Sequence, residues 1–426
     1  MGDLTNYGLL IIHKEGILEP ITLHLDDITY GGAAVGRYEG KAVFVPGGIP
    51  GEDVRVEIVE QKPRYAYARL LEVLRPSPDR VAPPCHAFGR CGGCQWQHIA
   101  YEAQLRFKTK IVRDQLQRLA QVSEPPVQPI IGMAEPWRYR NNMQFVVDDK
   151  GHLCLLEAGS NRPVAVGDCR LLCPELCEVF DQMELDYPGL AGVTLRVGRA
   201  TGERMIVLET EGEEEAPEVE VDQPVSCVLL LPDGTGAALI GSTCLHEELG
   251  GRSLRVSAGS FFQVNTEQAG QLMRLVLEFA DVQPGQTVLD AYGGVGTFGL
   301  ALAETARQVI IVEGSPSAVA DARENAAGAP NVRVIQGAVE AVLPTLEGPL
   351  DVAVLDPPRA GVAKEALAAL AERRPTRIVY VSCDPGSLAR DVRYLLERGY
   401  TLRTVQPVDM FPQTHHIESV ALLKRG

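Results

Sequence analysis

The sequence predicts an α/β protein that ends in a doubly wound, Rossmann-like parallel sheet, preceded by a mixed α+β region and an N-terminal OB-like β-barrel. Apolar runs alternate with helical segments through the last third of the chain. Short strands with Gly and Pro turns fill its beginning. A length of 426 residues fits two or three domains rather than one. These three observations together carry the prediction.

The composition excludes several classes of protein. With 45% hydrophobic and 23% charged residues, the chain is neither disordered nor collagenous, and it is too long for a disulfide miniprotein. No run approaches the roughly 20 apolar residues of a membrane helix. The N-terminus, MGDLTNYGLLIIHKEG, has an early acid and a short apolar run, unlike a secretory signal. We therefore expect a cytoplasmic protein without a membrane partner, whose ten cysteines serve metal binding or catalysis rather than disulfides.

Residues 16–76 are predicted to form the OB-like barrel. Apolar and polar residues alternate in ITLHLDDI, KAVFV and VRVEIVE, and clusters of Gly and Pro separate these segments. Any small β-domain would give a similar pattern. The following RPSPDRVAPPC contains four prolines and is typical of a linker.

Residues 80–262 are predicted to form a central domain with a metal site. Cys85, Cys91 and Cys94 are separated by five and then two residues, and Cys169 is the expected fourth ligand. Zinc and an iron–sulfur cluster both accept four thiolates, so spacing alone leaves both open. A helix over residues 96–120 has one apolar face and is expected to pack on the C-terminal domain.

The charge is unevenly distributed along the chain. The formal net charge is −16, and nine acidic residues stand against one arginine between residues 201 and 222. This acidic segment is predicted to be a solvated loop. Five basic residues face a single aspartate between residues 106 and 118. The net charge therefore does not exclude an RNA partner.

Residues 263–426 are predicted to form the doubly wound domain. Five largely apolar segments are predicted to be strands: TVLDAY, QVIIVEG, VRVIQG, LDVAVLDPP and RIVYVSCDP. Helical segments lie between them, and two more strands are predicted in the C-terminal tail. In this class of sheet, ligands bind at the carboxyl ends of the strands. Catalytic and binding residues are therefore expected there.

The first strand of this domain leads into a glycine turn, DAYGGVGTFGL. Gly293, Gly294 and Gly296 would let the backbone approach a ligand closely. Glu313 ends the next strand, where an acid accepts hydrogen bonds from ribose hydroxyls, and Asp356 ends a later one. Because the turn departs from the dinucleotide pattern G-x-G-x-x-G, we favour S-adenosylmethionine over a dinucleotide.

Two residues near the C-terminus suggest covalent chemistry. Cys383 lies at the end of a buried strand, and Glu418 interrupts a hydrophobic strand, where burial would raise the pKa of a general base. A thiol that adds to carbon 6 of uracil makes carbon 5 nucleophilic towards a methyl donor, and a base then removes the carbon 5 proton. A methyl donor, a thiol and a carboxylate suit this reaction.

Taken together, these segments resemble the RNA 5-methyluridine methyltransferases of the TrmA and RumA type, in the branch with a TRAM domain and an iron–sulfur cluster. The resemblance runs through GGAAVGRYEGKAVFVPGGIPGE, CGGCQWQHIAYEAQLRFK, WRYRNNMQF, SAGSFFQVN, DAYGGVGTF, LDPPRAG, VSCDPGSLARD and HHIESVALL. It implies S-adenosylmethionine contacts at Gln263, Tyr292, Glu313 and Asp356. It implies Cys383 as nucleophile and Glu418 as base. It also implies a [4Fe-4S] cluster on the four cysteines named above, which decides between the metals.

The expected partner is RNA in which the target uridine is flipped out of its stack. Ribosomal RNA is the first candidate and transfer RNA the second. The enzyme is expected to be a monomer. Candidate phosphate contacts are Arg138, Arg140, Lys108 and Lys110, and Phe262 is a candidate for base stacking. Two alternatives stay open: a non-catalytic RNA-binding protein on the same scaffold, and methylation of carbon 5 of cytidine.

Overall fold

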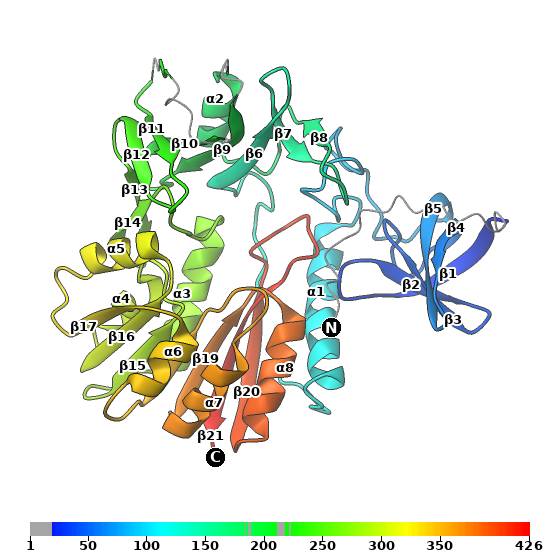
Figure 1. The fold of residues 1–426 in the computed structure, drawn as a ribbon. Helices are drawn as coiled ribbons and strands as arrows, with labels where there is room; N and C mark the ends of the chain where they lie inside the picture. Colours follow the sequence, from blue (N-terminus) through cyan, green and yellow to red (C-terminus); the bar gives the residue numbers. More distant parts are fainter. Residues whose placement is uncertain (1–18, 184, 186–188, 211–217, 221–222) are drawn as a thin grey trace.

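A computed structural model describes residues 19–183, 185, 189–210, 218–220 and 223–426. The N-terminal segment that we judged unlike a secretory signal therefore lies outside the described residues. The chain forms a β-barrel, a central sheet and a C-terminal α/β sheet, and Figure 1 shows the barrel standing to one side of the other two. The predicted α/β fold class is confirmed.

The barrel closes with the strand order β1-β2-β3-β5-β4. Its strands are β1 (Ile21–Ile28), β2 (Ala34–Tyr38), β3 (Lys41–Val45), β4 (Asp53–Gln61) and β5 (Tyr65–Arg75). Alternate residues such as Leu23, Val43 and Val56 point inward and form its small core. The segment predicted to be a linker is anchored on this barrel, because Glu52 is fully buried and accepts hydrogen bonds from Arg80 and from the backbone of Ser77.

The central region is a seven-stranded sheet in the order β12-β11-β10-β9-β6-β7-β8 with one helix. Its elements are β6 (Asn142–Val147), β7 (Leu153–Leu156), β8 (Pro163–Ala165), α2 (Pro174–Asp181), β9 (Leu190–Val197), β10 (Arg204–Thr210), β11 (Ser226–Leu230) and β12 (Gly236–Ile240). The prediction of a solvated loop over 201–222 is wrong for β10. Its residues Met205–Leu208 are buried because they pair with β9 on one side and β11 on the other. Residues 211–217 and 221–222 lie outside the described residues.

The C-terminal sheet has seven strands in the order β17-β16-β15-β18-β19-β21-β20. They are β15 (Thr287–Ala291), β16 (Gln308–Glu313), β17 (Val332–Gln336), β18 (Val352–Leu355), β19 (Arg377–Ser382), β20 (Tyr400–Val408) and β21 (Glu418–Arg425). The first five run parallel, and β21 is antiparallel to both of its neighbours. The chain order reverses between β15 and β18, so a ligand crevice is expected at their carboxyl ends.

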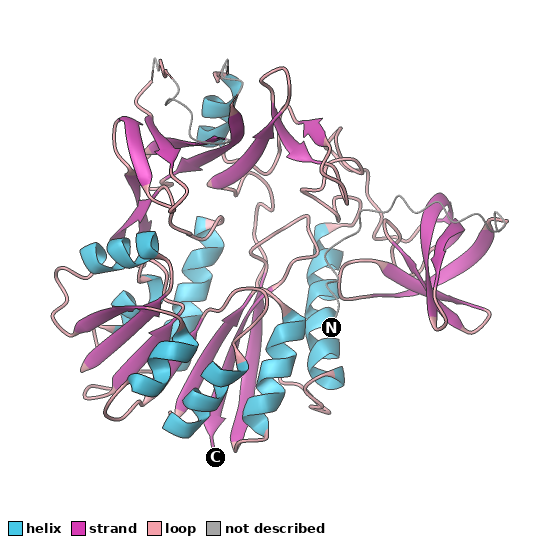
Figure 2. Cartoon of the chain, viewed as in Figure 1, coloured by secondary structure: helices cyan, strands magenta, loops and turns pink. Residues whose placement is uncertain are grey.

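Helices cover both faces of this sheet (Figure 2). They are α3 (Thr266–Ala280), α4 (Thr297–Leu302), α5 (Pro316–Asn325), α6 (Val339–Val342), a 3₁₀ turn (Leu343–Thr345), α7 (Lys364–Arg373) and α8 (Pro385–Leu396). Successive strand residues point to opposite faces of the sheet and pack in two separate cores. Leu289 and Ala353 belong to one core, and Val288 and Val352 belong to the other. A hairpin of β13 (Cys244–Leu249) and β14 (Arg252–Ser257) joins the central sheet to this domain.

Helix α1 (Tyr101–Arg118) packs on the C-terminal sheet, with Ile111, Val112 and Leu116 in the same core as α7 and α8. It begins later than the expected residue 96. The residues before the helix are not helical, because the N–H groups of Gln95 and Trp96 donate to the carbonyl of Gln413. No helix in the described part of the chain has the length and hydropathy to cross a membrane.

Lys108 on α1 is a buried ion-pair partner rather than a phosphate contact, so that prediction is wrong. Its side chain is 0% exposed, its Nζ lies 2.5 Å from Oδ1 of Asp409, and it also donates to the carbonyl of Phe411. Lys110 bridges α1 to the barrel instead, 2.8 Å from Asp27 and 2.5 Å from Asp114. Helix α1 is therefore held by charge on both sides.

We predict that Lys108→Met destabilises the fold strongly, because it leaves the Asp409 carboxylate buried without its cation. Breaking such a pair costs about 3–5 kcal/mol. The matched variant Lys110→Met removes two partly exposed ion pairs, to Asp27 and Asp114, each of which should contribute about 0–1 kcal/mol. Urea unfolding of both variants measures the difference. Equal midpoints would contradict this role for Lys108.

Candidate active site

The carboxyl ends of the parallel strands bring three predicted residues to one edge of the sheet, together with Asp290, which was not predicted. Asp290 lies near the end of β15, Glu313 ends β16, Asp356 follows β18 and Cys383 follows β19. Strands β15 and β18 are neighbours at the point where the strand order reverses. The charges of Asp290 and Glu313 both act on Asp356, so these side chains lie close together.

The glycine turn after β15 has the strained backbone typical of a ligand site. Gly294 and Gly296 have φ angles of +54° and +93°. A Cβ on Gly293 would lie 2.6 Å from Ile311 and 3.0 Å from Oδ2 of Asp290, which leaves no room for a side chain. Tyr292 adopts a φ of +62°, a conformation that costs energy for a non-glycine residue and clusters at functional sites.

Three carboxylates converge at this turn without a basic partner. Burial and the neighbouring acids raise the pKa of Asp356 to about 7, and burial raises the pKa of Asp290 to about 7. Both carboxylate oxygens of Glu313 accept backbone N–H groups, which fixes its orientation. None of the three forms an ion pair with a described residue. Oδ1 of Asp290 is buried and has no hydrogen-bond partner. The crevice therefore suits a ligand that carries hydrogen-bond donors and positive charge.

Antiparallel pairing of β19 with β21 sets Cys383 beside Glu418. The register pairs Ser382 with Ser419, so the next residues at this edge are Cys383 and Glu418. Glu418 is 3% exposed, and burial raises its pKa well above the usual value. Burial, followed by the charge of Glu418, raises the pKa of Cys383 to about 12. The thiol is thus close to the carboxylate, as the proposed chemistry needs.

Arg359 is a residue that the sequence analysis missed. It is exposed in the loop after β18, and its charge acts on Cys383, Glu418 and Tyr30. It lowers the pKa of the thiol, against the effect of burial. The signal was its place in LDPPRAG, three residues after the predicted ligand-binding Asp356.

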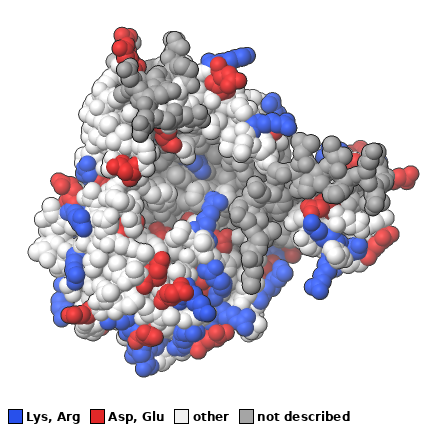
Figure 3. Space-filling view, in the orientation of Figure 1, with Lys and Arg blue, Asp and Glu red and all other residues white. Residues whose placement is uncertain are grey.

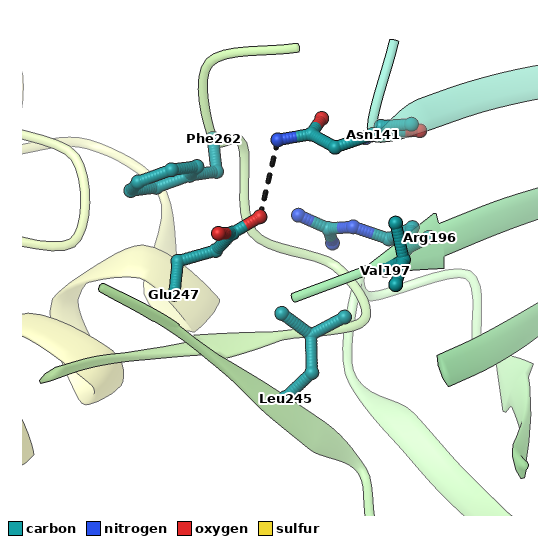
Figure 4. Close-up of a pocket in the computed structure, with 7 residues that line it drawn as sticks. Asn141, Arg196, Val197, Leu245, Glu247 and Phe262 are labelled. Carbon is teal, nitrogen blue, oxygen red and sulfur yellow. Dashed lines mark hydrogen bonds between the residues drawn. The ribbon is translucent and has the colours of Figure 1, made fainter. Parts of the chain in front are cut away.

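Gln263 is held by a buried polar cluster at the base of its loop. Asn141 donates to the Gln263 carbonyl at 3.1 Å and to Glu247 at 3.1 Å. Figure 4 shows Asn141, Arg196 and Glu247 pointing toward one another beside Phe262. The cavity between them measures about 10 Å³, the size of one water molecule. The cluster therefore supports the loop and has no room for a substrate.

The prediction that Phe262 stacks on a base is wrong. Phe262 is 4% exposed because its ring packs into the core below the loop. The adjacent Phe261 is 68% exposed and is the aromatic side chain available at this position. The sequence alone did not distinguish the two neighbours.

The four predicted metal ligands converge. Cys85, Cys91, Cys94 and Cys169 are free thiols, and each pair is close enough for its charges to interact. The N–H of Gly93 donates to the Cys91 sulfur at 3.4 Å. Within the described residues, however, no group of three or more His, Cys, Asp or Glu side chains has the geometry of a metal site. The residues fit four-thiolate binding in kind and number, whereas their present arrangement is looser than a ligand shell.

Arg138 and Arg140 lie beside this cysteine group. Arg138 is paired with Asp168 at 2.6 Å and donates to the sulfur of Cys177 at 3.0 Å. Arg140 is half-buried, and its Nε has no partner. Arg138 is therefore already engaged by the protein, which disfavours its predicted phosphate contact, and the contact of Arg140 stays a prediction.

Comparison with known proteins agrees with this site. Residues 248–426 match the family model described as tRNA (uracil-5-)-methyltransferase, and residues 21–71 match the TRAM domain model. An RNA methyltransferase of Halalkalibacterium halodurans is 38% identical, over 97% of this chain and 98% of the relative. The chain belongs to the RNA methyltransferase family. A second member, from Bacillus cereus, is 36% identical over 96% of this chain and 97% of its own length.

A solved structure of the same kind aligns along nearly the whole methyltransferase chain. The tRNA (uracil-54, C5)-methyltransferase of Pyrococcus abyssi, in complex with S-adenosyl-L-homocysteine, is 26% identical with a TM-score of 0.73. The alignment covers 95% of this chain and 100% of that one. The resemblance to this methyltransferase family and the expectation of an enzyme are confirmed.

We predict that S-adenosylmethionine binds to this methyltransferase less tightly as the pH falls from 8 to 6. Asp290 and Asp356, each with a pKa near 7, take up protons over that range, and the group of acids then loses negative charge that would attract a sulfonium. Calorimetric titration should show an affinity loss of up to about tenfold for one protonated carboxyl. S-adenosylhomocysteine, whose sulfur is neutral, is the matched ligand and should show a smaller loss. Identical pH profiles for the two ligands would refute the electrostatic role.

Proposed function

We propose that this enzyme methylates carbon 5 of uridine in RNA, with S-adenosylmethionine as methyl donor. The observation that carries the proposal is the placement of Cys383 beside the buried Glu418 at the edge of the acidic crevice. The names of the matching family model and of the Pyrococcus abyssi neighbour support uracil as the base. The target uridine is flipped into the site, because carbon 6 is hidden inside a stacked helix.

The protein supplies the reactive groups around the uracil ring. S-adenosylmethionine, when bound, provides a methyl group on a positively charged sulfur. Asp290, Glu313 and Asp356 are the acids that would hold it, and the family resemblance adds Gln263 and Tyr292 as further contacts. This acceptance of a cation follows from the unpaired Oδ1 of Asp290 and from the absence of ion pairs to the three acids in the described chain.

Cys383 and Glu418 act in sequence. The Cys383 thiolate forms a bond to carbon 6, and the electron pair of the ring double bond moves toward carbon 5 and the 4-oxygen. Carbon 5 then takes the methyl group, whose bond to the donor's sulfur would break with its electron pair staying on that sulfur, so that S-adenosylhomocysteine is the leaving group. Glu418 then takes the proton from carbon 5, the double bond forms again, and the bond from carbon 6 to sulfur breaks. A carboxylate with a raised pKa accepts this proton more readily than an exposed glutamate.

The thiol needs help to lose its proton, because burial raises its pKa to about 12. Two features of the site favour the thiolate. The positive charge of Arg359 lowers the pKa of Cys383. Cys383 also directly precedes the N-terminus of α8, and helix N-termini stabilise thiolates.

Ribosomal RNA is our first candidate substrate and transfer RNA is the second. The barrel supports binding of RNA, since OB-like barrels bind oligonucleotides. Lys and Arg side chains are interspersed with Asp and Glu over the visible described surface (Figure 3). The negative net charge therefore does not exclude RNA binding on this face. Mapping of 5-methyluridine in RNA from a strain without this gene distinguishes the two substrates and locates the modified positions.

A [4Fe-4S] cluster on Cys85, Cys91, Cys94 and Cys169 is part of the proposal. The mutual proximity of the four thiols and the N–H donor at Gly93 support it. The cluster would tie the segment 85–94 to the central sheet, and the reaction does not require it.

We predict that Cys383→Ala abolishes methyl transfer and that Glu418→Gln traps a covalent complex of protein and methylated RNA. The first variant cannot form the bond to carbon 6, whereas the second forms it and cannot remove the carbon 5 proton, which should slow turnover about 10²–10⁴-fold. Denaturing gels with radiolabelled methyl donor detect both results, and Cys244→Ala is the matched thiol control. Methyl transfer by Cys383→Ala at the wild-type rate would refute the nucleophile. Nucleoside analysis that finds 5-methylcytidine instead of 5-methyluridine would refute uracil as the target base.

We predict that the protein purified without oxygen is brown and contains iron and acid-labile sulfide in roughly the ratio of a [4Fe-4S] cluster. Cys94→Ser should lose the colour, and Cys244→Ser should keep it. A colourless protein that holds only zinc would contradict the cluster assignment.

A further inference from the structure

The loop between β1 and β2 of the barrel reaches the segments that carry the proposed catalytic residues. Gly32 in this loop packs so closely on the segment before β21 that a Cβ would lie 2.6 Å from Cβ of His415. Its carbonyl accepts a hydrogen bond of 3.0 Å from the indole of Trp96. The barrel therefore packs against the segment that leads into β21 and Glu418.

Tyr30 in the same loop contacts the other side of the site. Its hydroxyl donates a hydrogen bond to the carboxylate of Asp384, the residue after Cys383. The second oxygen of Asp384 caps α8 by accepting from the N–H of Ser387 at 2.7 Å. A Cβ on Gly386 would lie 3.7 Å from the Tyr30 ring, so the ring rests on the first turn of α8.

These contacts bear directly on the thiol. Five charged or titratable groups from four parts of the fold face the thiol: Glu418 from β21, Asp356 and Arg359 from the loop after β18, Asp384 from the start of α8, and Tyr30 from the barrel. The charge of Asp384 raises the pKa of Cys383, and a hydrogen bond donated to that carboxylate weakens the effect. Burial, and then the bond to Asp384, raises the pKa of Tyr30, so the phenol keeps its proton and stays the donor.

We propose that Tyr30 is a positioning residue of the active site, through which the barrel holds the Asp384 carboxylate and sets the reactivity of the Cys383 thiol. The inference rests on the proposed role of Cys383 as nucleophile. It assigns to the barrel a part in the chemistry, in addition to binding RNA. Tyr30 is 47% exposed, so a substitution at this position leaves no cavity in the core.

The test is Tyr30→Phe, which removes the hydroxyl and keeps the ring. Alkylation of Cys383 by iodoacetamide, followed by peptide mass spectrometry over a range of pH without RNA, reports the thiol directly. We expect the profile to move to higher pH and the alkylation rate at pH 8 to fall about three- to tenfold, since one pKa unit is a tenfold change. We expect kcat to fall by a similar factor and KM for RNA to change less than twofold. Tyr38→Phe is the matched control, because the Tyr38 hydroxyl has no partner in the described part of the chain, and it should behave as wild type.

Asp384→Asn tests the route of the effect. If Tyr30 acts through the Asp384 charge, adding Tyr30→Phe to Asp384→Asn should change the alkylation profile no further. An unchanged profile in Tyr30→Phe overturns the inference, and so does a raised KM with unchanged kcat, which would make Tyr30 an RNA contact. Methyl transfer by Cys383→Ala would overturn the proposed function instead. The two failures are therefore distinguishable.

Discussion

The antiparallel pairing of β19 with β21 is the constraint on which the site depends. A parallel sheet ends all its strands at one edge, but it offers no strand that begins there. Because β21 enters the sheet from that edge, its first residue, Glu418, lies opposite the residue that follows β19, Cys383. A slip of one residue in this register would turn one of the two side chains to the other face of the sheet.

Buried acids at the same edge are costly for the fold and useful for the site. Asp290 and Asp356 have raised pKa values because burial disfavours their charged forms. Part of that cost is offset by backbone N–H groups, such as that of Gly299, which donates to Asp290 at 2.7 Å. Oδ1 of Asp290 is left without a partner, and a ligand that donates a hydrogen bond would satisfy it. The positive φ of Tyr292 is a second local cost at the same place.

Contacts between the barrel and the rest of the chain join the TRAM domain to the proposed active site. Helix α1 is clamped to the sheet by the buried pair of Lys108 with Asp409 and to the barrel by Lys110. Glu52 anchors the proline-rich segment that follows the barrel. The β1–β2 loop of the barrel contacts both Asp384 and His415, so the barrel borders the proposed active site.

The amino-acid sequence was sufficient to predict the small barrel and the alternating strands and helices of the C-terminal sheet, because apolar periodicity and turn residues act over short stretches of chain. It also indicated Cys383 and Glu418, since each carries chemistry into an otherwise apolar strand end. Tertiary structure alone decided which charged and aromatic side chains are free: Lys108 is neutralised by Asp409, Phe262 is buried while Phe261 is exposed, and β10 takes part of the acidic segment into a sheet. Arg359 and Tyr30 likewise reach the thiol only through folding. Burial and pairing depend on partners hundreds of residues away, and no local pattern records them.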